Sequence, residues 1–278
     1  MSSDYHRPGQ WQILPLVVKN LLIVNGILYF ATVVLGEKLD LDLTRYLGLY
    51  LPGSEYFRPH QFITHLFMHG SLMHLFSNMF ALWMFGNVLE NHWGPRRFMV
   101  FYLVTGLGAA LIHTLIGLYE IDQVRMVIDA FSIQPDPDQL TRILGDYHIY
   151  ITPKLQEFIA VWRDQPGNTA YLEEAQAIGQ EIISYRLNVP TVGASGAVFG
   201  VLLAFGMMFP NTIIYLYFAI PMKAKWFVLL YGLFELYSGI QANPQDNVAH
   251  FAHLGGMLFA FILIRLWNRD RHHYGGGY

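Results

Sequence analysis

The chain has 278 residues, of which 54% are hydrophobic and only 13% are charged. Soluble domains carry about 25% charged residues, so this composition indicates a membrane protein. The formal net charge of -3 provides no basic field for nucleic acid, and the lack of cysteine excludes disulfides, thiolate metal sites and a cysteine nucleophile.

The apolar residues gather in six stretches that polar, helix-breaking segments separate. A helix that crosses a bilayer needs roughly 20 apolar residues, and the stretches reach or approach that length. We therefore expect an all-α polytopic membrane protein with six membrane helices, near 14–36, 70–92, 97–119, 193–209, 224–240 and 248–267. No small-residue cleavage site follows the first stretch, which we expect to remain as an anchor.

Lysine and arginine predict the orientation of these helices. With six crossings, most of the basic residues near the helix ends fall on one side, which the positive-inside rule makes cytoplasmic. We expect a cytoplasmic N-terminal segment (1–13), a membrane domain (14–267) and a cytoplasmic tail (268–278), in the inner membrane of a bacterium. The residues that set this orientation are Arg7, Lys19, Arg96, Arg97, Lys223, Lys225, Arg265, Arg269 and Arg271.

One polar region interrupts the membrane domain, between the third and fourth helices. It runs from about residue 120 to 190, is rich in charge and contains helix-like stretches such as 155–162 and 171–178. This length is far beyond an ordinary connection. The orientation places the insertion outside, where we expect a small helical cap packed on the bundle; a substrate- or partner-binding element is the alternative.

Two short motifs in different membrane helices carry candidate chemistry. Ser195 lies between Gly193 and Gly196 at the start of the fourth stretch, and His253 lies in the sixth. Small residues at a spacing of four let two membrane helices approach closely. Such stripes occur in both stretches and predict that the two helices touch beside Ser195 and His253; they comprise Gly196, Gly200, Ala204, Ala252, Gly256 and Ala260.

A serine hydroxyl becomes a good nucleophile when a base within about 2.6–3.2 Å accepts its proton. His253 can be that base for Ser195. No carboxylate lies near His253 in the sequence, so we expect a catalytic dyad and not a triad. Glu235 in the fifth stretch is an intramembrane acid, a class of residue that is usually functional, but the sequence identifies no partner for it.

The second stretch offers donors for a developing negative charge. His74 and Asn78 are four residues apart and share one helix face, which should point into the protein because lipid disfavours polar groups. Together with the backbone N–H of Ser195 near a helix N-terminus, they can form an oxyanion hole. We expect His69, just before this helix, to support the geometry.

These motifs, in this order, resemble the rhomboid intramembrane serine proteases: His69 with His74-x-x-x-Asn78, then Gly193-Ala194-Ser195-Gly196, then Ala252-His253-x-Gly255-Gly256. The resemblance implies a six-helix core, Ser195 as nucleophile, His253 as general base, and Asn78 and His74 as oxyanion donors. It implies cleavage of transmembrane protein substrates within the lipid bilayer, with no cofactor and no nucleic acid partner. The oligomeric state and the physiological substrate stay unknown.

Two other functions remain open on the sequence. Histidines spaced along several helices loosely resemble the histidine boxes of membrane metal-dependent oxidases, since imidazoles on neighbouring turns can bind iron or zinc. These histidines are His65, His69, His74, His250, His253, His272 and His273. That interpretation leaves the serine motif and the glycine stripes unexplained. A catalytically silent membrane chaperone of the same fold is the third possibility.

Overall fold

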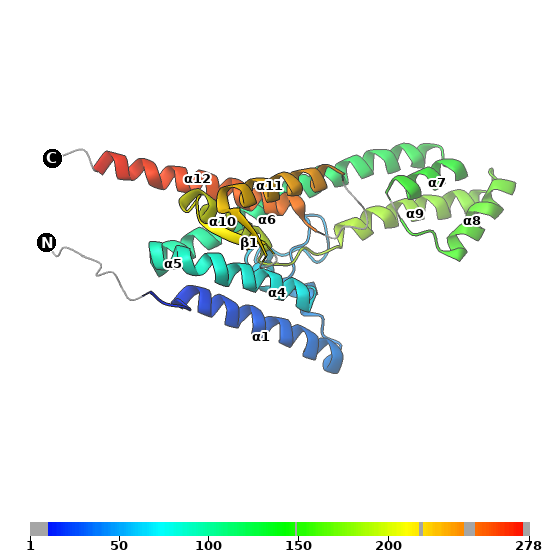
Figure 1. Ribbon diagram of the computed structural model, residues 1–278. Coiled ribbons are helices and arrows are strands. Elements are labelled where there is room, and N and C mark those ends of the chain that lie inside the picture. Colours follow the sequence, from blue (N-terminus) through cyan, green and yellow to red (C-terminus); the bar gives the residue numbers. More distant parts are fainter. Residues whose placement is uncertain (1–10, 148, 217–218, 242–247, 275–278) are drawn as a thin grey trace.

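The computed structural model describes residues 11–147, 149–216, 219–241 and 248–274, the last six of these by their backbone only. The described part is built almost wholly of helices (Figure 1). Its elements are α1 (Leu16–Leu39), α2 (Leu43–Leu47), α3 (Gln61–Thr64), the 3-10 turn η1 (His65–Phe67), α4 (Leu72–Ala81), the π-helical segment η2 (Leu82–Gly86), α5 (Asn87–Trp93), α6 (Pro95–Ile133), α7 (Pro137–Asp146), α8 (Pro153–Asp164), α9 (Thr169–Leu187), α10 (Ser195–Met208), the strands β1 (Ile213–Leu216) and β2 (Ile220–Lys223), α11 (Ala224–Gln241) and α12 (His250–Tyr274).

The all-α membrane fold that the sequence predicts is confirmed. Among the described residues, four helical stretches are long and apolar enough to cross a membrane, namely α1, the continuous run from α4 to α5, α6 and α12. The fourth and fifth predicted helices are α10, with 14 residues, and α11, with 18. The sequence did not predict the antiparallel hairpin of β1 and β2, which joins α10 to α11.

Helix α10 lies at the centre of the bundle. It packs against α6, α12 and α11, and also against the run from α4 to α5. Ten of its 14 residues are buried, so both small and large side chains of α10 face protein. At 1.5 Å per residue, α10 is about 21 Å long, whereas the hydrocarbon core is about 30 Å thick. One end of α10 must therefore lie below the membrane surface.

The start of α1, the corner between α5 and α6, and the end of α12 lie at one end of the bundle (Figure 1). The guanidinium of Arg97 stands 4.1 Å from the ring centroid of Trp267, which ties α6 to α12 there. These three segments thus lie at one end of the bundle, and the side of the membrane that this end faces stays a prediction.

The insertion differs from the predicted cap. Helix α6 continues far past the predicted end near residue 119, and α7, α8 and α9 pack against this extension as a projection beyond the bundle (Figure 1). The projection has a core of its own, in which Ile128, Phe131, Leu140 and Trp162 are fully buried. The insertion therefore has a core of its own and projects beyond one end of the bundle (Figure 1).

A buried carboxylate fixes the start of α1. The two oxygens of Glu90 on α5 accept hydrogen bonds of 2.8 Å from the backbone N–H groups of Val17 and Val18. These N–H groups belong to the first turn of α1, where no intrahelical partner exists, and the negative charge also suits the helix N-terminus. Glu90 is only 2% exposed, so its carboxylate accepts the hydrogen bonds that water would accept at an exposed helix start.

We predict that Glu90→Gln destabilises the fold by about 1–3 kcal/mol, because one charged acceptor becomes an amide N–H₂ that opposes a backbone N–H. The thermal midpoint of the purified protein in detergent measures this effect. Glu37→Gln, at an exposed position of α1, is the matched control and should leave the midpoint unchanged. Equal midpoints for the two variants would contradict the capping role.

Candidate active site

Ser195 begins α10 directly after a turn that only glycine tolerates. Gly193 has a φ of 127°, in the region that favours glycine, and a Cβ there would lie 2.8 Å from the ring of His74. The same Cβ would lie 3.6 Å from the Ser195 Oγ. Because Gly193 has no side chain, the His74 ring can lie close to this turn, near Ser195.

The segment before Ser195 is held by hydrogen bonds from other parts of the chain. Thr191 forms two backbone hydrogen bonds with Leu49, of 2.8 and 2.9 Å, and its hydroxyl lies 2.7 Å from the Nε2 of His113 on α6. The Gly193 N–H donates to the carbonyl of His65 at 2.9 Å. Three elements therefore fix the position at which α10 begins.

The start of α10 also provides backbone donors. The hydrogen bond from the Val198 N–H to the Ala194 carbonyl, 3.0 Å long, closes the first turn. By helix geometry the N–H groups of Ser195, Gly196 and Ala197 point out of the N-terminus without intrahelical partners. An anion beside Ser195 would meet these N–H groups and the positive end of the helix dipole.

The predicted contact between α10 and α12 is present at one pair of glycines. A Cβ on Gly256 would collide with the backbone of Gly196, and a Cβ on Gly196 would also meet the carbonyl of Ala252, at 3.4 Å. Gly200 differs from the prediction, because a Cβ added there would lie 2.8 Å from the side chain of Thr105 on α6 and would not face α12. A Cβ on Gly196 would also collide with Ala109 of α6, so Gly196 lies between α6 and α12, and Gly200 lies against α6.

The His253 ring lies on the serine face of α10. It stacks on the ring of Phe199 with a centroid distance of 4.0 Å and an interplanar angle of 7°. Phe199 follows Ser195 by four residues, and residues at this spacing share one helix face. Ser195 is half-buried and His253 is 7% exposed, so the base is more enclosed than the nucleophile.

A carboxylate partner of His253, which the sequence did not reveal, comes from α11. The Glu235 Oε2 lies 2.8 Å from the Nδ1 of His253 and 2.6 Å from the Nδ1 of His250. All three side chains are buried. An acidic residue in an apolar helix, as Glu235 is, indicated a function. The sequence could not show that Glu235 pairs with His253, because 18 residues separate them.

The donor side of the site comes from α4 and the loop before it. Asn78 is 6% exposed, and its Nδ2 has no hydrogen-bond partner among the described residues. The rings of His69 and His74 meet edge to face at a centroid distance of 5.0 Å, and His74 is within electrostatic reach of His253. A buried amide N–H₂ without a hydrogen bond costs free energy, so this group is suited to donate to an acceptor on a bound substrate.

His69 and His65 lie outside the helices that cross the membrane, in the segment before α4. Burial lowers the pKa of His69 to about 3 and that of His65 to about 4, so both rings are neutral at neutral pH. The Nδ1 of His65 lies 2.8 Å from the carbonyl of Gln61. Neither ring nitrogen of His69 has a partner among the described residues.

One group of side chains has the donors to hold a metal ion. Glu235, His250 and His253 each offer one ligand atom, and these atoms lie within 4.8 Å of one another. A carboxylate with two imidazoles is a known zinc ligand set. The other histidines of the proposed histidine boxes are not gathered with these three in the described side chains. The side chains of His272 and His273 lie outside the described part of the structure.

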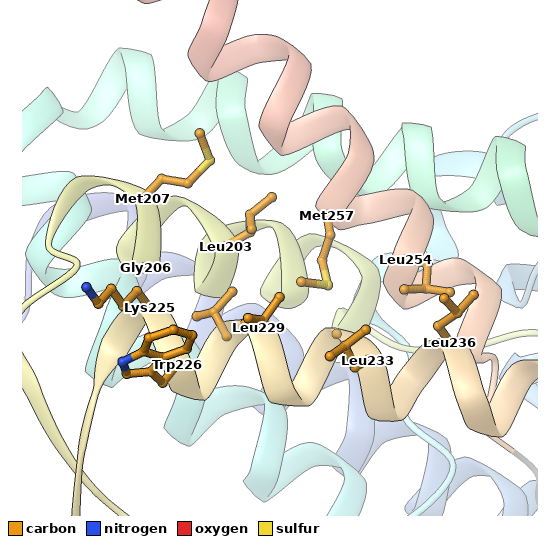
Figure 2. A pocket seen from close by; sticks show the side chains of 12 residues that line it. Leu203, Gly206, Met207, Lys225, Trp226, Leu229, Leu233, Leu236, Leu254 and Met257 are labelled. Atoms are coloured by element: carbon orange, nitrogen blue, oxygen red, sulfur yellow. The ribbon is translucent and has the colours of Figure 1, made fainter.

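An apolar pocket of about 540 Å³ opens between α10, α11 and α12, beside the site and not at it (Figure 2). Leucine and methionine side chains from these helices, such as Leu203, Leu233 and Met257, converge in it. Leu254 and Leu236 line the pocket and are the neighbours in sequence of His253 and Glu235. The pocket therefore lies next to the segments of α11 and α12 that carry Glu235 and His253.

Comparison with known proteins finds one family. The family described as Rhomboid domain matches residues 56–121 and 170–269, which together form more than half of the chain. The unmatched stretch between them contains α7 and α8. The matched residues thus run from α3 into α6 and from α9 into α12, whereas the extension of α6 past residue 121, α7 and α8 lie outside the match.

Several curated proteins are similar to this chain. RHOMBOID-like protein 12, mitochondrial, of Arabidopsis thaliana is 24% identical over 216 residues, which cover 77% of this chain and 47% of that protein. Rhomboid-like protein 15 of the same plant is 30% identical over 114 residues, 40% of this chain and 27% of that protein. Uncharacterized rhomboid protein P4H10.10, mitochondrial, of Schizosaccharomyces pombe is 24% identical over 214 residues, 74% and 51% respectively. The chain spans about half the length of these relatives or less.

The glycine contact between α10 and α12 can be tested by one methyl group. We predict that Gly256→Ala lowers the stability by about 1–3 kcal/mol, because the new Cβ collides with the Gly196 backbone and forces the helices apart. Gly26→Ala is the matched control, since a Cβ on Gly26 of α1 meets nothing within 4 Å. Its thermal midpoint should be equal or higher, given the better helix propensity of alanine. A Gly256→Ala protein as stable as Gly26→Ala would contradict the contact.

Proposed function

Because the chain belongs to the rhomboid family, we propose that it is an intramembrane serine endopeptidase in which Ser195 and His253 form the catalytic pair. The observation that carries the proposal is that the ring of His253, on α12, stacks on Phe199 over the face of α10 that also holds Ser195. The Gly196–Gly256 contact brings the two helix backbones together, and the stack on Phe199 turns the His253 ring toward the face that holds Ser195.

In the proposed reaction, His253 accepts the proton of the Ser195 hydroxyl as its oxygen attacks the scissile carbonyl carbon. The carbonyl oxygen becomes an oxyanion. The Ser195 N–H, the Asn78 amide and the His74 ring are its proposed donors, and the unpartnered Asn78 Nδ2 supports this role. His253 then gives the proton to the leaving amine, and a water molecule hydrolyses the acyl-enzyme by the same route.

The position of the site suits substrates that are themselves in the membrane. Ser195 begins a helix of about 21 Å at the end of the bundle that faces the projection. If the other end of α10 lies at the membrane surface, Ser195 lies roughly 9 Å inside the hydrocarbon region. Peptide bonds at that depth belong to transmembrane segments, so membrane proteins are the proposed substrates and the lipid bilayer is the medium.

The two alternative functions make different demands on the site. An oxidase needs a cluster of histidine ligands, whereas the described side chains gather only two histidines and one glutamate. A silent relative would not need an activated serine, yet this chain retains both Ser195 and His253. The protein is an integral membrane protein. Some of its relatives are named mitochondrial, so the bacterial inner membrane stays a prediction.

We predict that Ser195→Ala and His253→Ala each abolish cleavage of a transmembrane reporter by the purified protein in liposomes, because each removes one half of the proton transfer. Ser77→Ala on α4, whose hydroxyl bonds to the carbonyl of His74, replaces a serine near the site and is the control. It should retain cleavage within a factor of about three. Cleavage retained by Ser195→Ala would end the serine protease proposal.

For the oxyanion donors, Asn78→Ala should lower kcat by about 10²–10³ with little change in KM, since a lost oxyanion donor affects the transition state more than substrate binding. Steady-state cleavage of the same reporter measures both constants. An Asn78→Ala enzyme with a raised KM and an unchanged kcat would instead place Asn78 in substrate binding.

A further inference from the structure

Glu235 is the one acidic side chain within hydrogen-bond reach of His253 in the described part of the chain. It comes from the middle of α11 and is only 3% exposed. A buried carboxylate in an apolar helix is costly unless it is paired, so its two bonds to imidazoles account for its presence there. These bonds join α11 to α12 at the level of the proposed catalytic base.

We propose that Glu235 is a positioning residue that converts the serine–histidine pair into a serine–histidine–glutamate triad, with His250 holding the carboxylate in place. The proposal rests on the proposed function. An ionised carboxylate can only accept hydrogen bonds, so the proton of the neutral His253 ring lies on Nδ1. The Nε2 lone pair is then free to receive the Ser195 proton, as a general base requires.

Two contacts together fix the ring of His253. Stacking on Phe199 sets the plane of the imidazole, and the hydrogen bond to the Glu235 Oε2 sets its rotation within that plane. The second bond of the same oxygen, to the Nδ1 of His250 at 2.6 Å, prevents the carboxylate from turning away. A base held in this way populates the productive rotamer and tautomer before the reaction begins.

The carboxylate also acts on charge. When the Ser195 O–H bond breaks and the oxygen bonds to the carbonyl carbon, the proton moves to the Nε2 of His253 and makes the ring an imidazolium. Glu235 stays ionised, and its negative charge 2.8 Å from Nδ1 stabilises that cation in a buried site. The proton leaves with the amine, and His253 returns to its neutral tautomer.

The distances favour hydrogen bonds over a shared metal ion. Zinc ligands lie about 2.0–2.2 Å from the ion, so tetrahedral ligand atoms stand more than about 3 Å apart. The Glu235 oxygen is closer than that to both histidine nitrogens, at 2.6 and 2.8 Å. The arrangement is that of a carboxylate which accepts two N–H bonds.

The test compares full-length Glu235→Gln and Glu235→Leu with the wild type on a transmembrane reporter in liposomes. Glutamine keeps an acceptor but removes the charge, and leucine removes both. We expect kcat to fall about tenfold or more for Gln and about 100-fold or more for Leu, with KM within twofold of the wild type. Glu90→Gln, the same change in a buried carboxylate at the other end of the bundle, should keep kcat within twofold even though it lowers stability.

A double-mutant cycle separates positioning from a general structural role. Because His253→Ala abolishes cleavage, the rate of fluorophosphonate labelling of Ser195 is the readout of this cycle. In the His253→Ala background, Glu235→Gln should slow labelling no further, because the residue it positions is gone. If the Glu235 variants fold poorly, His250→Asn tests the same unit and should lower kcat while KM is retained. A wild-type kcat in Glu235→Gln, a further loss in the double variant, or loss of wild-type activity on treatment with a chelator would each overturn the proposal. Cleavage retained by Ser195→Ala would instead overturn the proposed function itself.

Discussion

The close approach of α10 and α12 at Gly196 and Gly256 is the contact on which the site depends. With no side chain between the two backbones, the first turn of α10 and the first turn of α12 stand at the same level. Ser195 and His253 belong to these two turns. A side chain at Gly256 would collide with the backbone of Gly196 and force α10 and α12 apart, so the helix packing and the proposed chemistry depend on the same contact.

Around this contact, each neighbouring helix supplies one part of the site. Helix α6 supports the start of α10 through His113, α4 presents the Asn78 amide, whose Nδ2 has no partner in the described part of the chain, and α11 brings Glu235 to His253. Because the polar groups are buried in the bundle, the surrounding lipid cannot satisfy them, and they must pair with one another or with a bound substrate. The Glu235 carboxylate pairs with two histidines, whereas the Asn78 Nδ2 has no partner among the described residues.

The sequence predicted the positions of the helices better than the contacts between them. Hydrophobic length predicted six stretches that are helical in the structure, four of which are long enough to cross a membrane in the described part of the chain. The Gly-x-Ser-Gly motif indicated the serine, because both signals are local. The end of α6 was missed since the extension past residue 119 is amphipathic and polar, with its apolar face packed on the projection. Contacts between distant residues left no local pattern. Gly200 packs on Thr105 although its spacing matched the stripe toward α12, and Glu235 meets His253 across two helices.

The central claim is that Ser195 is a nucleophile activated by His253. Its most direct test is to treat the protein in liposomes with a fluorophosphonate and to locate the adduct by peptide mass spectrometry. The account predicts a single phosphonylated residue, Ser195, in the wild type, and labelling slower by at least about 100-fold in His253→Ala. An adduct on another serine, or labelling of Ser195 at the same rate without His253, would contradict it.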